Sequence, residues 1–278
     1  MKHRIPAALV IAVVSLRICA LGQFTPREVA DREDLEKFLL SAAIVKSEPI
    51  GEGVTKPMKV FLKQGDIEHK AAWKNVSGSP LGVPDEWRYE IAAYRMDKLL
   101  DLRMIPPTVE RELEGREGSL QLWAETARSL LDVMDKGIPI PPSVSELMVR
   151  NKYLVRAFDS LIANDDRTQQ NIRYTEDWRT ILIDHSRSFR SSKDSFESLF
   201  FGRHGTKKGE DGRMFLFKTL PRVFFERLKS LTFESIQATT AGTLNEKEIR
   251  AVLARRDLLI KDIEEMIAER GENEVLYN

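Results

Sequence analysis

The chain has 278 residues, of which 42% are hydrophobic and 31% are charged, and its formal net charge is zero. This composition excludes a disordered chain and provides enough apolar material for one sizeable core or two small lobes. The zero net charge lacks the basic excess typical of proteins that bind nucleic acid, so no nucleic-acid partner is expected.

Residues that hold zinc or act as thiol nucleophiles are scarce. The single cysteine, Cys19, lies in an N-terminal segment that we expect to be removed, which excludes zinc ribbons and cysteine nucleophiles. His69, His185 and His204 are too scattered along the sequence for a His-based zinc site. The serine-hydrolase pattern G-x-S-x-G is also missing from the sequence. Most hydrolase classes are therefore excluded.

Residues 1–22 have the pattern of an export signal. Lys2 and Arg4 give a positive start, and residues 5–16 form an apolar run that is too short to span a bilayer. The tripeptide Ala-Leu-Gly at 20–22 then provides the small-x-small pattern that signal peptidase prefers. We expect a cleaved signal peptide, a secreted or periplasmic location and no membrane span after cleavage. A retained N-terminal anchor or a buried cytosolic helix are the alternatives.

The first half of the chain predicts mainly strands. The expected elements, in order, are a helix over 31–40, strand-like residues over 41–60 broken at Gly51 and Gly53, strands over 59–63 and 70–74 around a turn at 65–66, a loop over 78–84, a helix capped by Asp85, and a hairpin of 110–113 with 119–123.

The second half changes to helical spacing. Apolar residues follow a helical period around Phe158 and again around Ile260, and the last long helix is expected to end at Gly271. A strand-rich half joined to a helix-rich half predicts an α+β chain with two lobes. We place the N-lobe at 23–125 and the C-lobe at 126–278.

The strongest local signal is a polar loop followed by a short hairpin. The pattern predicts strands over 172–174 and 180–183, whose open end would bring Asn171 and Asp184 together, with Asp166 on the adjoining loop. An amide oxygen and a carboxylate are suitable ligands for Mg²⁺ or Mn²⁺. Phosphoryl transfer uses such a metal together with a separate carboxylate that orients the attacking hydroxyl. The alternative is a polar turn without chemistry.

The run Asp166-Arg167-x-x-x-Asn171, followed by a hydrophobic strand and Asp184, resembles the catalytic and metal-binding segments of the phosphatidylinositol 3-/4-kinase-like superfamily. It is also similar to the secretory-pathway kinases that phosphorylate proteins and proteoglycans. The resemblance implies a two-lobed protein-kinase-like fold, with Asp166 as the catalytic carboxylate and Asn171 and Asp184 as metal ligands. Thr168 departs from the lipid-kinase pattern, which has His at that position.

The first half supplies candidate partners for a nucleotide. Lys74 ends a predicted strand, where a kinase-like fold keeps its phosphate-binding lysine. Glu90 lies on the apolar stripe of its helix, and a carboxylate that points inward needs a cation. We therefore predict a Lys74–Glu90 pair with a catalytic role, although a solvated lysine and an exposed glutamate are the alternatives.

The remaining nucleotide contacts are inferred more weakly. Gly51 and Gly53 lie between two strand-like runs and could fold over the phosphates of ATP, although paired glycines often mark a plain turn. By analogy with kinases, residues 121–125, which include Trp123 and Glu125, would form the hinge that holds the adenine.

A basic segment follows Asp184. Its cationic side chains could grip an acidic or phosphorylated acceptor, or could belong to a solvated loop; they are Arg187, Arg190, Lys193, Arg203, His204, Lys207 and Lys208.

These observations together predict an exported kinase that uses ATP and Mg²⁺ (or Mn²⁺) and transfers phosphate to a hydroxyl acceptor. The acceptor could be a protein, a glycan, a small molecule or a lipid head group. The alternatives are a lipid kinase, a catalytically silent pseudokinase that binds nucleotide or a partner protein, and a structural protein in which the kinase-like sequence motif occurs by chance.

Overall fold

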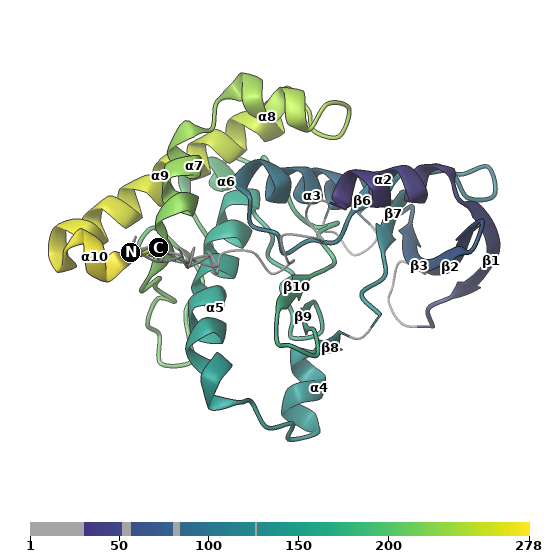
Figure 1. Ribbon diagram of the computed structural model, residues 1–278. Coiled ribbons are helices and arrows are strands. Elements are labelled where there is room, and N and C mark those ends of the chain that lie inside the picture. Colours follow the sequence, from purple (N-terminus) through teal and green to yellow (C-terminus); the bar gives the residue numbers. More distant parts are fainter. Residues whose placement is uncertain (1–30, 52–56, 80–83, 126) are drawn as a thin grey trace, which may run out of the picture.

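The computed structural model describes residues 31–51, 57–79, 84–125 and 127–278. The expected signal peptide over 1–22 and Gly53 lie outside these ranges. Figure 1 shows a sheet at one end of the molecule and long helices at the other, joined through the middle of the chain. The predicted α+β architecture is therefore confirmed.

The first half of the chain builds a five-stranded antiparallel sheet. Its strands, in spatial order, are β1 (Ala43–Pro49), β2 (Met58–Gln64), β3 (Ile67–Lys74), β7 (Ser119–Leu122) and β6 (Thr108–Glu110). Side chains alternate between the two faces of a strand, so Ala71 and Trp73 both enter the core from β3 while Lys74 points the other way. The helix α2 (Arg32–Ser41) and a second helix, α3 (Arg88–Leu100), lie alongside the sheet.

The hairpin between β2 and β3 turns at Gly65 and Asp66, as predicted. Gln64 pairs with Ile67, so the loop has two residues, and such loops favour a positive φ that glycine adopts without strain. Gly65 has φ 60°. This turn sets the register that puts Lys74 at the end of β3.

The expected helix cap at Asp85 is wrong. Helix α3 follows Trp87 at its N-cap, and no side chain caps it. Asp85 instead belongs to β5 (Asp85–Glu86), which pairs with β4 (Ser77–Gly78). Its carboxylate is buried and forms an ion pair with Arg187, with 3.2 Å between Oδ2 and Nε. A long-range partner has therefore replaced the local cap.

The second half is mainly helical, with a small sheet of three strands. Its elements are β8 (Arg128–Ser129), α4 (Leu130–Asp135), α5 (Pro142–Ile162), β9 (Ile172–Tyr174), β10 (Thr180–Leu182), α6 (Asp194–Glu197), β11 (Leu220–Pro221), α7 (Arg222–Ser230), α8 (Phe233–Thr239), α9 (Glu246–Arg270), α10 (Glu272–Val275) and β12 (Leu276–Tyr277). The strand β8 pairs with β9, so residues from 128 onward already belong to this half.

Helix α9 begins and ends where its sequence indicates. Asn245 accepts the Glu248 amide, and the Glu248 side chain accepts the Asn245 amide, which completes a capping box. Gly271 follows the last turn with φ 88°, a conformation that favours glycine. This helix packs on α5 and α6 and forms the back of the second half.

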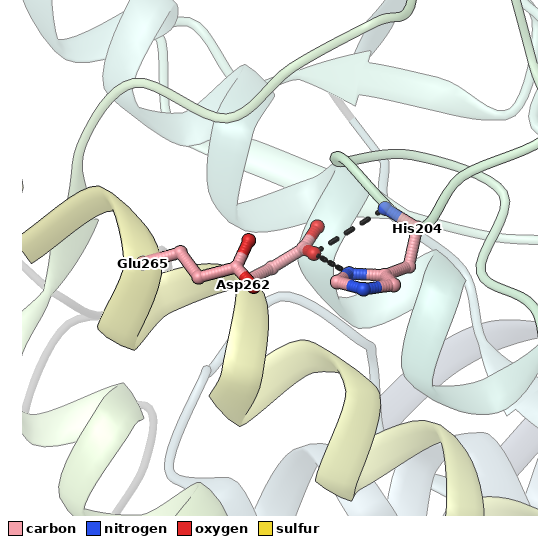
Figure 2. Close-up of side chains that lie close together, drawn as sticks. All are labelled: His204, Asp262 and Glu265. Carbon is pink, nitrogen blue, oxygen red and sulfur yellow. Dashed lines mark hydrogen bonds and ion pairs between the residues drawn. The ribbon is translucent and has the colours of Figure 1, made fainter. Parts of the chain in front are cut away.

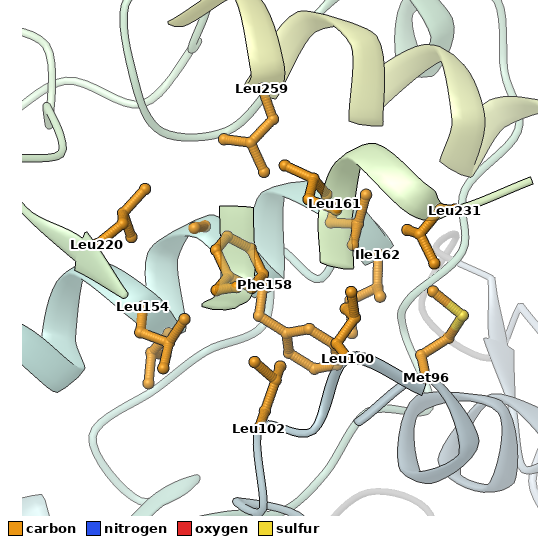
Figure 3. Close-up of a cluster of buried hydrophobic side chains, with 14 of the residues drawn as sticks. Met96, Leu100, Leu102, Leu154, Phe158, Leu161, Ile162, Leu220, Leu231 and Leu259 are labelled. Atoms are coloured by element: carbon orange, nitrogen blue, oxygen red, sulfur yellow. The ribbon is translucent and has the colours of Figure 1, made fainter. Parts of the chain in front are cut away.

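Two of the three hydrophobic clusters among the described residues make up most of the core. The smaller core lies under the five-stranded sheet and includes Trp73 and Leu120. The larger core joins α3 to α5 and α9, and Figure 3 shows Met96 and Leu100 of α3 in the same cluster as Phe158 and Leu259. Helix α3 therefore connects the sheet-bearing half to the helical half. No helix in the described ranges is both long and apolar enough to cross a membrane.

Candidate active site

Lys74 and Glu90 form the ion pair that the sequence predicts. Lys74 Nζ lies 2.6 Å from Glu90 Oε1, and these side chains are 16% and 2% exposed. Lys74 comes from the end of β3 and Glu90 from the first turn of α3, so the pair ties the helix to the sheet. Lys74 Nζ also donates to Asp184 Oδ1 at 2.7 Å. One ammonium group thus connects both halves of the chain.

The electrostatics of this group keep Lys74 and Glu90 charged. Burial alone would lower the pKa of Lys74, but Asp184 and Glu90 outweigh burial and hold the pKa above its usual range. Burial likewise opposes the charge on Glu90, but Lys74, and after it the His185 side chain, lower the pKa of Glu90 well below its usual range. The arrangement is a charged, desolvated centre rather than a solvated pair.

Asp184 and Asn171 meet at the open end of the β9–β10 hairpin. Leu182 pairs with Ile172, and the Ile183 amide donates to the Asn171 carbonyl at 3.2 Å, so Asp184 extends one residue beyond the paired end. Asp184 has φ 63°, a left-handed conformation that is uncommon for a residue other than glycine.

The amide of Asn171 is oriented by the loop before it. Its Nδ2 donates to the Asp166 carbonyl at 3.1 Å. An amide that donates through its nitrogen keeps its oxygen for another partner. Asn171 Oδ1 and Asp184 Oδ2 are hard oxygen donors of the kind that Mg²⁺ or Mn²⁺ takes, so the residues present fit such a cation.

Arg167 holds the loop and the hairpin together, a role that the sequence analysis missed. Its guanidinium pairs with both oxygens of Asp159, at 3.0 and 2.9 Å. It also donates to the carbonyls of Asn171 and Ile183, at 3.1 and 2.7 Å. Asp159 lies fully buried on α5, one residue after Phe158. An acidic residue on the apolar face of a predicted helix was the available signal, because a buried carboxylate needs a cation.

His185 completes the support behind Asp184. Its backbone amide donates to Glu90 Oε2 at 3.0 Å, and its Nε2 lies 2.8 Å from Arg167 Nη2. Burial, followed by the nearby charge of Arg167, lowers the pKa of His185. The ring is therefore neutral near pH 7 and accepts from Arg167 through Nε2. Glu90, which fixes Lys74, and Arg167, which fixes the loop, are thus linked through His185, by its backbone amide and its ring.

Asp166 lies beside this centre and is partly accessible. Its side chain is 36% exposed, and its Oδ2 lies 3.4 Å from Nη1 of Arg187. Burial raises the pKa of Asp166, Arg187 lowers it, and the negative charges of Asp184, Asp165 and Asp85 raise it further. A partly exposed carboxylate with a raised pKa is suited to accept a proton from a hydroxyl.

Trp123 lines a cavity of about 60 Å³ at the junction of the two halves; the other residues of its wall are Ala72, Gln121, Leu122, Ala124, Arg173 and Ile183. Glu125 is not part of this wall, and its carboxylate pairs with Lys70 at 2.7 Å. Gly51 lies exposed after β1 with φ 81°. Trp123 therefore lines a cavity at the junction of the two halves, and Glu125 lies outside it.

A separate group of potential metal ligands lies on the far side of the C-lobe. Within the described part of the chain, His204, Asp262 and Glu265 form a group of His, Cys, Asp and Glu side chains close enough to share an ion (Figure 2). The backbone amides of Arg203 and His204 and the His204 ring all contact the Asp262 carboxylate. Asp262 therefore anchors the turn at 203–204, and this group shares no residue with the predicted metal site.

Comparison with solved structures defines the class of fold. A hydra Fam20 solved with sugar superposes with a TM-score of 0.64 at 16% identity, over 94% of this chain and 95% of that one. The Golgi casein kinase with Mn/ADP bound gives 0.61 at 15% identity, over 92% and 80%. The Helicobacter pylori proinflammatory kinase CtkA gives 0.53 at 11% identity, over 84% and 96%.

These likenesses show that the chain has a two-lobed, protein-kinase-like fold, as predicted. No protein-family model matches the sequence, and no curated protein matches it. At these sequence identities the structural similarity establishes the fold only. The roles of individual residues are argued from the geometry described above. The phosphatidylinositol 3-/4-kinase-like superfamily is not confirmed by these comparisons.

Proposed function

We propose that this protein is a metal-dependent kinase that transfers the γ-phosphate of ATP to a hydroxyl group. The observation that supports this most is the contact of Lys74 with both Glu90 and Asp184, at 2.6 and 2.7 Å. Three charged groups from three separate elements meet at the junction of the halves, beside a loop that carries Asp166. Phosphoryl transfer depends on such positioning and on charge neutralisation.

The proposal assigns a role to each residue of the site. Lys74 would hold the phosphates of the nucleotide, and Glu90 would keep the lysine in place. Asn171 and Asp184 would hold Mg²⁺ or Mn²⁺, which neutralises phosphate charge when bound. Asp166 would orient the acceptor hydroxyl and receive its proton. Trp123 would pack against the adenine, and Gly51 and Gly53 would lie near the phosphates.

A protein or a glycan is the preferred acceptor. Fam20 was solved with sugar and the Golgi casein kinase with Mn/ADP, and both superpose over more than nine-tenths of this chain. Thr168, at the position of the lipid-kinase His, supports the same preference over a lipid head group. The basic start and the short apolar run of residues 1–22 support export from the cytoplasm.

A transfer assay on purified chain 23–278 tests the proposal. The protein is incubated with labelled ATP, Mg²⁺ or Mn²⁺, and acceptors that include a casein-like protein, a glycan and a phosphoinositide. We expect metal-dependent labelling of one acceptor class and its loss in Asp166→Asn. Binding of Mg·ATP without transfer would make the protein a pseudokinase, and failure to bind Mg·ATP would remove the kinase proposal altogether.

A further inference from the structure

Three of the basic side chains after Asp184 contact carboxylates within the protein. Arg187 pairs with Asp85 and Asp166, Arg203 pairs with Glu265 and Glu269, and His204 contacts Asp262. These cations are therefore committed to holding the fold. Arg190 differs, because part of its guanidinium remains unused.

Arg190 lines a cavity of about 250 Å³ between α5, α6 and the loop that follows α6. The wall of this cavity is rich in hydroxyl groups, and its residues are Ser160, Ala163, Arg190, Ser192, Asp194, Ser195, Ser198, Phe200, Thr206 and Arg255. Helices α6 and α9 pack together here, which brings Arg255 to the wall. The volume is below that of a typical drug-sized site and is suited to a small group.

Arg255 is a buried cation held by neutral groups. The residue is 1% exposed, and it donates to the carbonyls of Leu161, Arg190 and Ser195 at 2.8 to 2.9 Å. Its Nη2 is buried and has no hydrogen-bond partner within the described ranges. Burial lowers the pKa of Arg255 to about 9. A buried charge without an opposite charge is costly, and an anion beside it would reduce that cost.

The other groups on the wall also keep protons for an acceptor. Arg190 Nη2 pairs with Asp165 at 2.6 Å, but its buried Nε has no partner among the residues described. Ser160 Oγ accepts the Phe201 amide, so its own proton can be donated elsewhere. Ser192 and Ser195 share one hydrogen bond of 2.8 Å, which leaves one of their two protons for another partner. Donors therefore outnumber acceptors on this wall.

We propose that this cavity binds a phosphate group, either as the free ion or as a phosphate monoester on a ligand. Two guanidinium groups and several hydroxyls are the donor set that recognises a phosphate dianion. The cavity adjoins the predicted catalytic loop, because Arg190 pairs with Asp165, the neighbour of Asp166. Asp194 is the one carboxylate on the wall, and its negative charge opposes the bound anion. The inference concerns binding and does not depend on the kinase proposal.

Calorimetric titration of chain 23–278 at low ionic strength tests the site, with inorganic phosphate in one arm and phosphoserine in the other. Arg190→Gln should weaken the binding of at least one of them by about tenfold or more, because it removes a charged donor. Asp194→Asn should strengthen binding by about two- to fivefold, because it removes a repelling charge. Tighter binding of phosphoserine than of phosphate would identify the ligand as a phosphorylated molecule, and the reverse would identify the free ion.

Asp165→Asn is the matched control. It breaks the same ion pair as Arg190→Gln but keeps the guanidinium, so it should retain or strengthen phosphate binding. Arg213→Gln, at a side chain that is 88% exposed, should leave binding unchanged. If neither anion binds to the wild-type protein, the proposal is wrong. It is also wrong if Arg190→Gln and Asp194→Asn bind the anion with the same affinity as each other. Arg255→Lys, which keeps the charge but loses Nη2, should weaken binding while a thermal melt shows a folded protein.

Discussion

The central residue of the candidate site is Lys74, because its ammonium contacts carboxylates from two different halves of the chain. Glu90 reaches it from α3 and Asp184 from the end of the β9–β10 hairpin. The burial of Lys74 and Glu90 makes these contacts strong and makes the loss of either partner costly. The site is therefore sensitive to single substitutions.

Lys74→Met should reduce transfer by about 10²–10³, because it removes the positive donor that faces the phosphates. Glu90→Gln should reduce transfer less, because Asp184 still holds the lysine. Steady-state kinetics with ATP as the varied substrate measures both effects. Circular dichroism should show an unchanged fold, and equal activity in Lys74→Met and the wild type would remove Lys74 from the mechanism.

Substitutions of Asp166 and Asp184 should have different effects on transfer and on nucleotide binding. Asp166→Asn should lower transfer by about 10²–10⁴ while Mg·ATP still binds, because it removes the proton acceptor. Asp184→Asn should weaken the metal-dependent binding of nucleotide itself, because it removes the anionic ligand. Nucleotide titrations with and without Mg²⁺, followed by transfer assays, distinguish the two. Asp165→Asn is the control and should keep most activity, because its carboxylate pairs with Arg190; loss of activity there with an active Asp166→Asn would contradict the assignment.

The pH dependence of transfer should report Asp166. Its pKa is raised by burial, while Arg187 opposes that rise. Because the ionised form accepts the proton, activity should fall as the pH decreases through this pKa, at a higher pH than the ordinary aspartate value of about 3.9. Arg187→Gln should move the acidic limb of kcat/KM to higher pH, because it removes the cation that lowers the pKa. An acidic limb at the same pH in both proteins would exclude Asp166 as its source.

At the scale of elements, one guanidinium joins the loop that carries Asp166 to α5 and to the hairpin. Arg167 contacts Asp159, two backbone carbonyls and His185. These partners lie on α5 and at the open end of the β9–β10 hairpin, so the loop cannot move without breaking several hydrogen bonds. The position of Asp166 depends on this connection.

Arg167→Gln should destabilise the protein by about 3–5 kcal/mol, because it leaves the buried Asp159 carboxylate without its cation. Urea unfolding followed by tryptophan fluorescence measures the change. Arg213→Gln is the control, since its exposed pair with Asp211 contributes little. A change below 1 kcal/mol in Arg167→Gln would show that the loop is held by other contacts.

At the scale of the molecule, α3 gives the fold its continuity. Glu90 on this helix belongs to the site, and Met96 and Leu100 belong to the large core of the helical half. The sheet has its own smaller core, so the two halves meet through α3 and the segment after β7. A kinase-like fold places its nucleotide site at such a junction.

The proposed export concerns the whole chain. The helices and strands given above all lie within residues 23–278, so this shorter chain contains every one of them. Mass spectrometry of protein from its native host should find an N-terminus near Gln23. Recovery of intact Met1 from the cytosolic fraction would contradict cleavage and export.

Local patterns in the sequence were sufficient for the elements and for much of the site. Alternation predicted β2 and β3, helical spacing predicted α5 and α9, and the polar loop before a hairpin brought Asn171 near Asp184. The position of Glu90 on the apolar stripe of its helix predicted a cationic partner for its carboxylate. Side-chain period depends on neighbours a few residues apart, and a carboxylate on an apolar face needs a cation wherever in the chain that cation lies.

Only the tertiary structure decided the contacts between distant segments. Asp85 and Arg187 are 102 residues apart, and Arg190 and Arg255 are 65 apart, so no local pattern links them. A local cap at Asp85 was therefore the wrong expectation, and the phosphate-sized cavity could not be foreseen. Such pairs form because helix packing brings the side chains together, and the low dielectric of the interior then selects which charges must meet.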